Sequence, residues 1–452
     1  MNKTKTANKN KLTQKKLKQF SSKFNRKKTN KVFKNVNTKQ NFKNLILKSD
    51  YIQNKKQHFK NTISIDTKIT NQKYSGRCWL FACLNIIRIP MIKKYKLENF
   101  EFSENYLFFY DKLEKANTFL NNIYKYKNKD FLDPKFSMLL KNITSDGGNW
   151  FYFINLIEKY GIIPKNNMDD HYHSQNSDEL NTFFNNYLLT AAKEIRDSKN
   201  FNKKLLNKIL YNCYKILVIF LGEPPKKITW EYYEKNEKNE KNEKKYKAIR
   251  NVTPIEFFNK YVPFNIKDKI YLINYPCKPY YKLYTQEINQ SINDSYNHNY
   301  INVPLDVMIN CVKKSINNKE AVYCGIDVHK FISRKHGILD TNAFNYKDIF
   351  GFDNTMKKCD AINYNLSIHN HAIIIRGYNS NKNSSGFLIE NSWGEDNAFK
   401  GNYFMSLEWF KKYVYSIVVD KNYADKKTVD VSKKKPIILP FNDRFMGVVE
   451  NI

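Results

Sequence analysis

One cysteine lies where the chain changes from a polar turn to a long apolar run. Cys78 follows a Ser-Gly-Arg segment and opens a stretch with the composition of a buried helix, and Gln72 lies six residues before it. A thiol attacks as the thiolate, and the positive end of a helix dipole would lower the pKa of Cys78. This arrangement predicts a nucleophilic thiol, with the Gln72 amide and the Cys78 backbone N–H as donors to an oxyanion. Cys83 lies inside the apolar run and is expected to be a core residue.

A histidine and an asparagine near the other end of the chain could complete such a site. His371 opens a strand-like segment, and Asn391 follows another strand twenty residues later. An imidazole can accept the thiol proton and return it, and an asparagine oxygen that accepts the ring N–H would orient the ring. Trp393 could shield this hydrogen bond from water. His369 shares the strand face, but the strand follows His371 directly, so His371 is the predicted base.

Hydrophobic periodicity predicts the elements that must position these residues. Helices are expected in the first half of the chain and strands in the second, which is typical of an α+β protein with two facing halves. The first helix is expected to end before Pro90. The predicted helices cover residues 78–89, 102–120, 150–160 and 177–221, and the predicted strands cover 321–328, 372–378, 386–390, 403–406 and 413–419.

Positive charge is concentrated at the N-terminus. The 452-residue chain has a formal net charge of +34, and residues 1–48 hold sixteen Lys or Arg and no Asp or Glu. This composition predicts a disordered tail. A solvated basic surface is the simpler interpretation, and counterion release on binding nucleic acid is the alternative. Residues 231–245, which contain Lys-Asn-Glu repeated three times, predict a solvated insertion or an exposed helix extension.

The sequence shows no pattern for a metal or a cofactor. The seven cysteines are scattered without a CxxC pair, and no His or Cys group has zinc-ligand spacing. We therefore expect no metal and no cofactor, and reduced thiols in a cytosol-like compartment. The longest stretch of large apolar residues, 216–221, is too short to span a membrane, so a soluble and unsecreted protein is expected.

The blocks around the candidate catalytic residues resemble the bleomycin hydrolase and aminopeptidase C family of papain-like cysteine peptidases. Further matches follow in collinear order from about residue 50 to the C-terminus, whereas we find no counterpart for residues 1–48. The matching blocks are Gln72 with Cys78-Trp79, Asp146-Gly147-Gly148-Asn149-Trp150, Glu158-Lys159-Tyr160-Gly161, Asp268-Lys269-Ile270, Gly325-Ile326-Asp327-Val328, His371-Ala372, Glu390 to Asp396, Lys400-Gly401, Glu408-Trp409-Phe410 and Ile437-Ile438-Leu439-Pro440.

The resemblance implies an α+β, papain-like two-lobe cysteine peptidase fold with a helical insertion for oligomer contacts. It implies an intracellular, cytoplasmic aminopeptidase that hydrolyses N-terminal peptide bonds through a Cys78-His371-Asn391 triad, and a homohexamer as the assembly. The expected regions are a basic tail (1–48), a helix-rich lobe with the nucleophile (49–175), a mainly helical insertion (176–300), a strand-rich lobe with His371 and Asn391 (301–436) and a C-terminal arm in the active-site cleft (437–452).

The same resemblance implies which residues bind the substrate, a peptide with a free N-terminus. The terminal carboxylate of Ile452 would pair with the substrate's α-ammonium, but the arm is one or two residues longer than in the family. A same-fold endopeptidase is therefore one alternative, and a nucleic-acid-associated protein using the basic tail is another; no membrane partner is expected. The predicted substrate-binding residues are Asp146, Gly147, Gly148, Asn149, Trp393 and Ile452.

Overall fold

The computed structural model places most of the chain in two units. Unit 1 combines residues 1–56 with 340–355, and unit 2 combines residues 57–339 with 356–452. The structure describes residues 11–53, 55, 58–64, 67–141, 143–199, 202–235, 244–287, 298–380, 385–396 and 398–445.

Unit 1 carries the basic N-terminal segment as helices. The structure differs here from the expected disorder, although residues 1–10 lie outside the described residues. Thr13 caps the first helix by accepting the Lys16 N–H, and apolar residues recur at helical spacing within a segment whose overall composition is polar. The elements of unit 1 are α1 (Gln14–Arg26), α2 (Lys28–Asn37), α3 (Phe42–Leu45), α4 (Ser49–Gln53), η3 (Thr341–Ala343) and α14 (Tyr346–Phe350).

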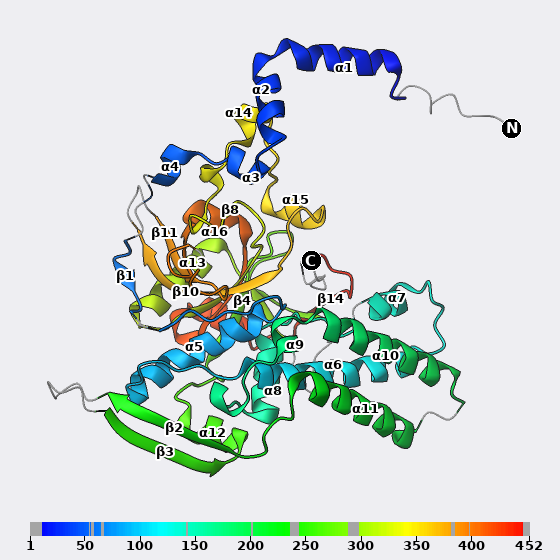
Figure 1. Cartoon of the computed structure of the whole chain (residues 1–452), viewed down its shortest axis with the longest axis vertical. Coiled ribbons are helices and arrows are strands. Elements are labelled where there is room, and N and C mark those ends of the chain that lie inside the picture. The colour runs from blue at the N-terminus through cyan, green and yellow to red at the C-terminus, as the bar shows by residue number, and fades with distance from the viewer. Residues whose placement is uncertain are drawn as a thin grey trace. The chain divides into compact units, whose positions relative to one another are not determined.

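Unit 2 contains a large mixed β-sheet and a separate two-stranded sheet (Figure 1). The predicted strands of the second half are all present, with bounds that differ by a few residues at most. In order across the large sheet the strands are β14 (Ile437–Leu439), β5 (Lys282–Gln286), β6 (Tyr300–Asn302), β4 (Lys269–Ile273), β13 (Val414–Asp420), β7 (Val322–Ile326), β10 (His371–Asn379), β11 (Gly386–Glu390), β12 (Asn402–Ser406), β9 (Ile338–Leu339) and β8 (Ile332–Ser333), and β1 (Asn61–Thr62) pairs with β10.

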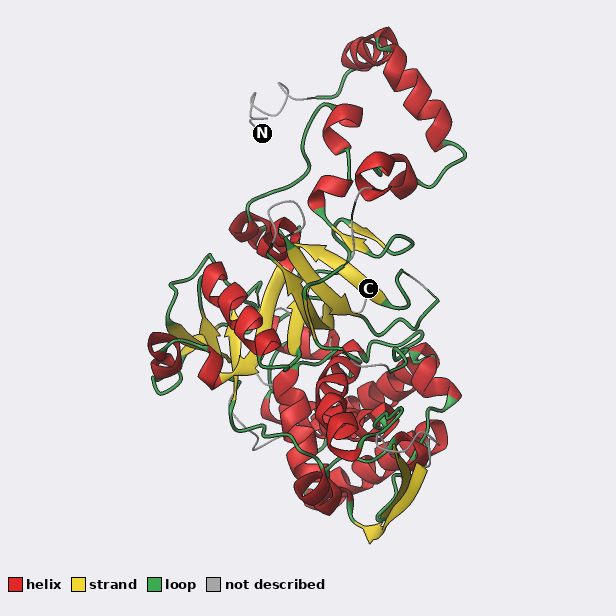
Figure 2. Cartoon of the chain, turned by 90° about the vertical axis from the view of Figure 1, so that its left-hand side faces the viewer, coloured by secondary structure: helices red, strands yellow, loops and turns green. Residues whose placement is uncertain are grey.

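A buried helix joins the sheet to the helical part of unit 2. Helix α5 (Cys78–Tyr95) is apolar on all sides and packs against β10, β7, α6 (Glu104–Lys125) and α8 (Trp150–Tyr160). It continues through Pro90, so the expected helix end is wrong. Burial of Met91 and Ile92 beyond the proline stabilises the last turns. Figure 2 shows the helices gathered next to the strands of this unit.

The region expected to be a mainly helical insertion is more varied than predicted. The expected helix 177–221 is two helices, α10 (Asp178–Asp197) and α11 (Lys203–Leu221). The Lys-Asn-Glu repeat is flanked by a hairpin of β2 (Ile228–Lys235) and β3 (Lys244–Val252) rather than by a helix, and residues 236–243 lie outside the described residues. Strands β4, β5 and β6 already belong to the sheet, so the expected boundary at residue 300 is too late.

The remaining elements of unit 2 are short helices and a few longer ones that connect or cover the elements described above. They are α7 (Pro134–Lys141), η2 (Lys165–Asn167), α9 (Tyr172–Gln175), α12 (Pro254–Tyr261), α13 (Leu305–Asn317), α15 (Lys358–Asn363), α16 (Leu407–Tyr413), η4 (Lys421–Tyr423) and α17 (Lys426–Val431). Among the described residues, no helix combines the length and apolar character needed to cross a bilayer.

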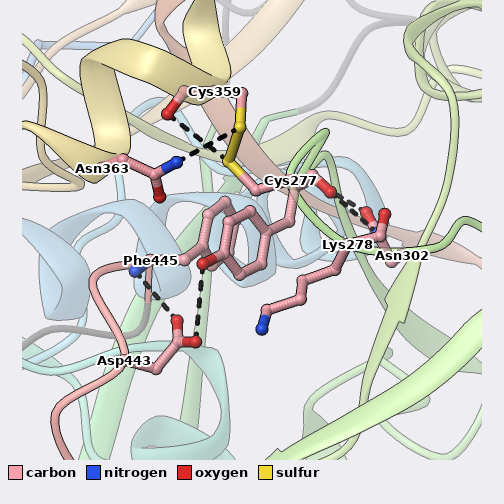
Figure 3. The surroundings of a disulfide bond; sticks show 8 residues. Cys277, Lys278, Asn302, Cys359, Asn363, Asp443 and Phe445 are labelled. Carbon is pink, nitrogen blue, oxygen red and sulfur yellow. Dashed lines mark hydrogen bonds between the residues drawn. A yellow bond between two sulfur atoms is a disulfide. The ribbon is translucent and has the colours of Figure 1, made fainter.

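A disulfide joins two segments that are distant in sequence. Cys277 and Cys359 are bridged, with 5.2 Å between their Cα atoms, which differs from the expectation that all thiols are reduced. The two cysteines are 82 residues apart, and no local sequence motif indicates that they pair, so the pairing follows from the fold. Figure 3 shows the bridge near the ring of Phe445, which stacks on Tyr275 with 4.5 Å between ring centroids. Phe445, in the second half of the C-terminal arm, therefore lies close to this bridge.

Candidate active site

The candidate nucleophile is the first residue of a buried helix. Cys78 begins α5, is 8% exposed, and belongs to the group of thiols without a disulfide. The first N–H groups of a helix have no partner within the helix, so they can donate to a charge that forms at this end. Cys83 lies one turn and a half further along α5 and is fully buried, in agreement with a core role.

A buried carboxylate holds the turn that precedes Cys78. Asp146 accepts the Gly76 N–H at 3.0 Å and pairs with the Lys112 ammonium at 2.7 Å. Burial by itself raises the pKa of Asp146, but Lys112 and the hydrogen bonds from Ser177 and Gly76 outweigh it and hold the pKa well below its usual range. A Cβ on Gly76 would lie 2.7 Å from the Asp146 Cβ, so only glycine allows this approach. The turn is therefore fixed by a charged group that stays ionised.

The candidate base and its orienting amide meet where β10 begins and β11 ends, at the same end of two neighbouring strands. In the antiparallel pair β10–β11, Ile374 lies opposite Glu390, so the residue after Glu390 lies beside the start of β10. The His371 Nε2 is 2.8 Å from the Asn391 Oδ1. Asn391 also accepts the Ser392 N–H at 2.9 Å, which holds its oxygen toward the ring. The other ring nitrogen of His371 is thereby left to exchange a proton with another group.

The thiol and the imidazole belong to neighbouring segments. A backbone hydrogen bond from Ala372, the residue after His371, reaches the Cys78 thiol and lowers its pKa. Burial is the larger influence and raises the pKa of Cys78 to about 11. Burial also lowers the pKa of His371 to about 4, although the hydrogen bond with Asn391 raises it in part. A single charge on either group is therefore disfavoured, and charge is expected to form on both together by proton transfer.

Gln72 is held in place from both ends of its amide. Its Oε1 accepts the Ser392 hydroxyl at 2.6 Å, and its Nε2 donates to the Ser75 carbonyl at 2.6 Å. The backbone adds a bond from Gln72 N–H to the Ser392 carbonyl at 2.9 Å. An amide nitrogen carries two hydrogens, so one of them stays available to a ligand. The segment beside Cys78 and the segment after Asn391 are thus joined directly.

These residues surround a cavity of about 1180 Å³. Two aromatic residues of the C-terminal arm, Phe441 and Phe445, line it as well. Asn391 is 1% exposed and lies behind the His371 ring rather than in the cavity wall. Ile452 lies outside the described residues. The predicted site residues that line the cavity are Gln72, Cys78, Asp146, Gly147, Gly148, Asn149, His371 and Trp393.

Two of the expected substrate-binding side chains are engaged within the protein. Asn149 caps α8 by accepting the Phe151 and Tyr152 N–H groups. Asp146 holds the Gly76 turn, as described above. A Cβ on Gly148 would lie 2.4 Å from the Trp79 ring, so glycine is required there by packing. The backbone of this segment, rather than the side chains of Asp146 and Asn149, is therefore what a substrate could contact.

Sequence reasoning missed three residues that shape the site. Lys112 is the buried counterion of Asp146, and Ser392 connects Gln72 to the asparagine segment. Arg334 lines the cavity with its guanidinium carbon 4.1 Å from the centre of the Trp393 ring. Ser392 adjoins Asn391 in sequence and could have been found there. Lys112 and Arg334 have no local pattern that marks them.

A thiol at a helix N-terminus, bonded to the strand that carries an imidazole, defines a cysteine peptidase of papain-like two-lobe fold. The chain belongs to the Peptidase C1-like family, whose model matches residues 11–446. This match includes most of the basic tail, so the expectation that residues 1–48 have no family counterpart is wrong for all but the first ten of them.

Named relatives cover most of the chain. Bleomycin hydrolase of Gallus gallus is 34% identical over 82% of this chain and 84% of its own length. Aminopeptidase C of Lactobacillus helveticus is 36% identical over 84% of this chain and 86% of its own. The crystal structure of PepW from Lactobacillus rhamnosis HN001 matches with a TM-score of 0.91 and 32% identity, covering 97% of this chain and 99% of that one.

Proposed function

We propose that this cysteine peptidase is an aminopeptidase of bleomycin hydrolase type that uses Cys78, His371 and Asn391 as its triad. The observation that carries the proposal is the pair of contacts around the imidazole: Asn391 holds His371 Nε2, and the following N–H, of Ala372, reaches the Cys78 thiol. The names of the relatives support release of residues from the N-terminus of peptides.

The proposed reaction follows from the positions of these groups. His371 takes the proton of Cys78, and the thiolate attacks the carbonyl carbon of the first peptide bond. The backbone N–H of Cys78 and the free hydrogen of Gln72 Nε2 stabilise the oxyanion. His371 then gives its proton to the leaving amine, and the acyl-enzyme is hydrolysed by a water that His371 deprotonates. Asn391 keeps the ring in the orientation that both transfers need.

A substrate panel tests the aminopeptidase mode. Cleavage of a peptide with a free N-terminus is expected to exceed cleavage of its N-acetylated form by about 10²-fold or more, because the α-ammonium would pair with the terminal carboxylate of Ile452. Mass spectrometry of the products gives both rates. A variant that lacks the last residue should lose part of this preference. Internal cleavage of the acetylated peptide at a similar rate would support the endopeptidase alternative instead.

The pH dependence of kcat/KM tests the state of the pair. In the competent enzyme, Cys78 and His371 share a single proton. Because the pKa of His371 is about 4, the ring takes up an additional proton only in acid. Because the pKa of Cys78 is about 11, the shared proton is lost only in alkali. We expect a flat profile from about pH 6 to about pH 7, and a decline above it as the substrate's own α-ammonium, with a pKa of about 8, loses its proton. Asn391→Ala should move the acid limb to lower pH, because its hydrogen bond raises the pKa of His371. A wild-type acid limb at or above the pKa of free histidine, about 6.5, would contradict this assignment.

We also propose that the chain assembles as a homohexamer. Helix α1 supports self-association, since it presents three apolar side chains on one face: Leu17 at 41% exposure, Phe20 at 57% and Phe24 at 42%. Sedimentation velocity of the full chain should give a six-subunit species, and the triple variant L17S/F20S/F24S should dissociate it. A monomeric wild type at micromolar concentration would refute the assembly.

Two further predictions concern the surroundings of the protein. A cytoplasmic location stays a prediction. The Cys277–Cys359 disulfide argues against it, because disulfides persist more readily in oxidising compartments than in the cytosol. Nucleic-acid binding by the basic tail also stays a prediction. The apolar stripe of α1 favours a protein contact over a phosphate backbone for that helix.

A further inference from the structure

One side of the scissile bond can be assigned from the direction of proton transfer. The leaving amine must receive its proton from His371, so the residue after the scissile bond lies on the imidazole side of the cavity. The oxyanion donors Gln72 and Cys78 lie on the acyl side. This separation rests on the proposed function and uses no other assumption about the substrate.

The imidazole side of the cavity continues into an aromatic ring and a guanidinium. The Trp393 ring lies 5.2 Å from the His371 ring, at an interplanar angle of 34°. The Arg334 guanidinium lies over the Trp393 ring at 4.1 Å, and both residues line the same cavity as Cys78. Arg334 follows β8 in the turn that leads to β9, and Gly337 closes this turn by donating its N–H to the Arg334 carbonyl. The guanidinium is thus held one ring beyond the catalytic imidazole.

Arg334 lines the cavity, and among the described residues it has no carboxylate at ion-pair distance. His329 lines the same cavity, and after burial the electrostatic influences of His329 and Arg334 also lower the pKa of His371, in keeping with positions near the ring. Three carboxylates line the cavity, Asp146, Asp178 and Asp396, and none of them makes an ion pair with Arg334 in the described structure. An arginine that is exposed, stacked and unpaired can accept a carboxylate through two parallel hydrogen bonds.

We propose that Arg334 determines specificity for the residue after the scissile bond, favouring peptides whose second residue has a carboxylate side chain. The guanidinium would bind this carboxylate while the Trp393 ring supports the plane of the arginine. Asp and Glu at the second position are the chemical class selected, and lysine at that position is disfavoured by like charge. The first residue, whose carbonyl Cys78 attacks, is not affected by this contact.

A competition between two peptides tests the assignment. Ala-Glu-Phe amide and Ala-Gln-Phe amide, with free N-termini, are mixed in one reaction, and the release of each truncated product is followed by mass spectrometry. At low conversion of an equimolar mixture, before the truncated products are trimmed further, the product ratio gives the ratio of kcat/KM and cancels any difference in active enzyme. We expect the wild type to favour the Glu peptide roughly 2–5-fold, as for a partly exposed ion pair, and the preference to shrink at about 1 M salt.

Arg334→Gln should bring the ratio close to one, and Lys335→Gln provides the matched control. Lys335 is the adjacent exposed residue, loses the same charge, and does not line the cavity. An unchanged ratio in R334Q, or an equal fall in K335Q, would overturn the assignment and leave the aminopeptidase itself intact. Failure of the wild type to cleave either peptide would overturn both proposals.

Discussion

Replacement of Cys78 by Ala is expected to lower kcat/KM for an amino-acid amide substrate by about 10⁴-fold or more, because removal of the nucleophile leaves only substrate binding and oxyanion donors. The thiol lies at the N-terminus of α5, against the Ala372 N–H and beside the cavity. Release of the free amino acid, measured with active wild type as reference, gives the loss. Circular dichroism of the variant should match that of the wild type, since one small buried group is exchanged for another.

Cys83→Ala is the matched control for this experiment. Cys83 is on the same helix, fully buried and without a disulfide. Its replacement should cost about 1 kcal/mol of unfolding free energy and leave kcat/KM within about twofold. Equal activity of C78A and the wild type would refute the proposed nucleophile. A loss in C83A as large as that in C78A would show that the helix, rather than the thiol at its end, is responsible.

Replacement of Asp146 by Ala is expected to destabilise the fold by about 3–5 kcal/mol, because the Lys112 ammonium would stay buried without its counterion. The Lys112 Nζ lies 2.7 Å from the Asp146 Oδ1, and the two side chains are 0% and 4% exposed. The Gly76 N–H and the Ser177 hydroxyl would lose their acceptor as well. Urea denaturation near neutral pH gives the difference in unfolding free energy. Activity should fall too, since the turn before Cys78 loses its anchor.

The pH dependence of this loss has a defined sign. The pKa of Asp146 is lower in the folded than in the unfolded chain, so its contribution to stability is complete above the unfolded value of about 3.9 and decreases as pH falls further. The difference between wild type and D146A should therefore be constant above about pH 5 and shrink in stronger acid. Asp197→Ala removes an exposed partner of Lys193 and should leave the unfolding free energy almost unchanged. Similar losses in D146A and D197A would contradict the buried-pair interpretation.

The sequence revealed where the elements that hold the candidate catalytic residues begin, because these starts are local patterns. A polar turn before an apolar run predicted the start of α5 at Cys78, and a histidine before a strand-like run predicted the start of β10. The same local reasoning predicted disorder where the structure has α1 and α2. That prediction used the average composition of the segment and overlooked the helical spacing of its apolar residues. It also misjudged Pro90, since only tertiary burial shows that the helix is stabilised beyond it.

Local periodicity and a set of collinear blocks thus determined the family, and they pointed to the candidate nucleophile and the candidate base by themselves. The tertiary structure decided what those residues contact. The antiparallel register of β10 and β11 places Asn391 at His371, and the packing of α6 against α8 places Lys112 at Asp146. It also placed Arg334 over Trp393 and joined Cys277 to Cys359. Such contacts depend on distances in space between remote segments, and the order of residues along one segment carries no record of them.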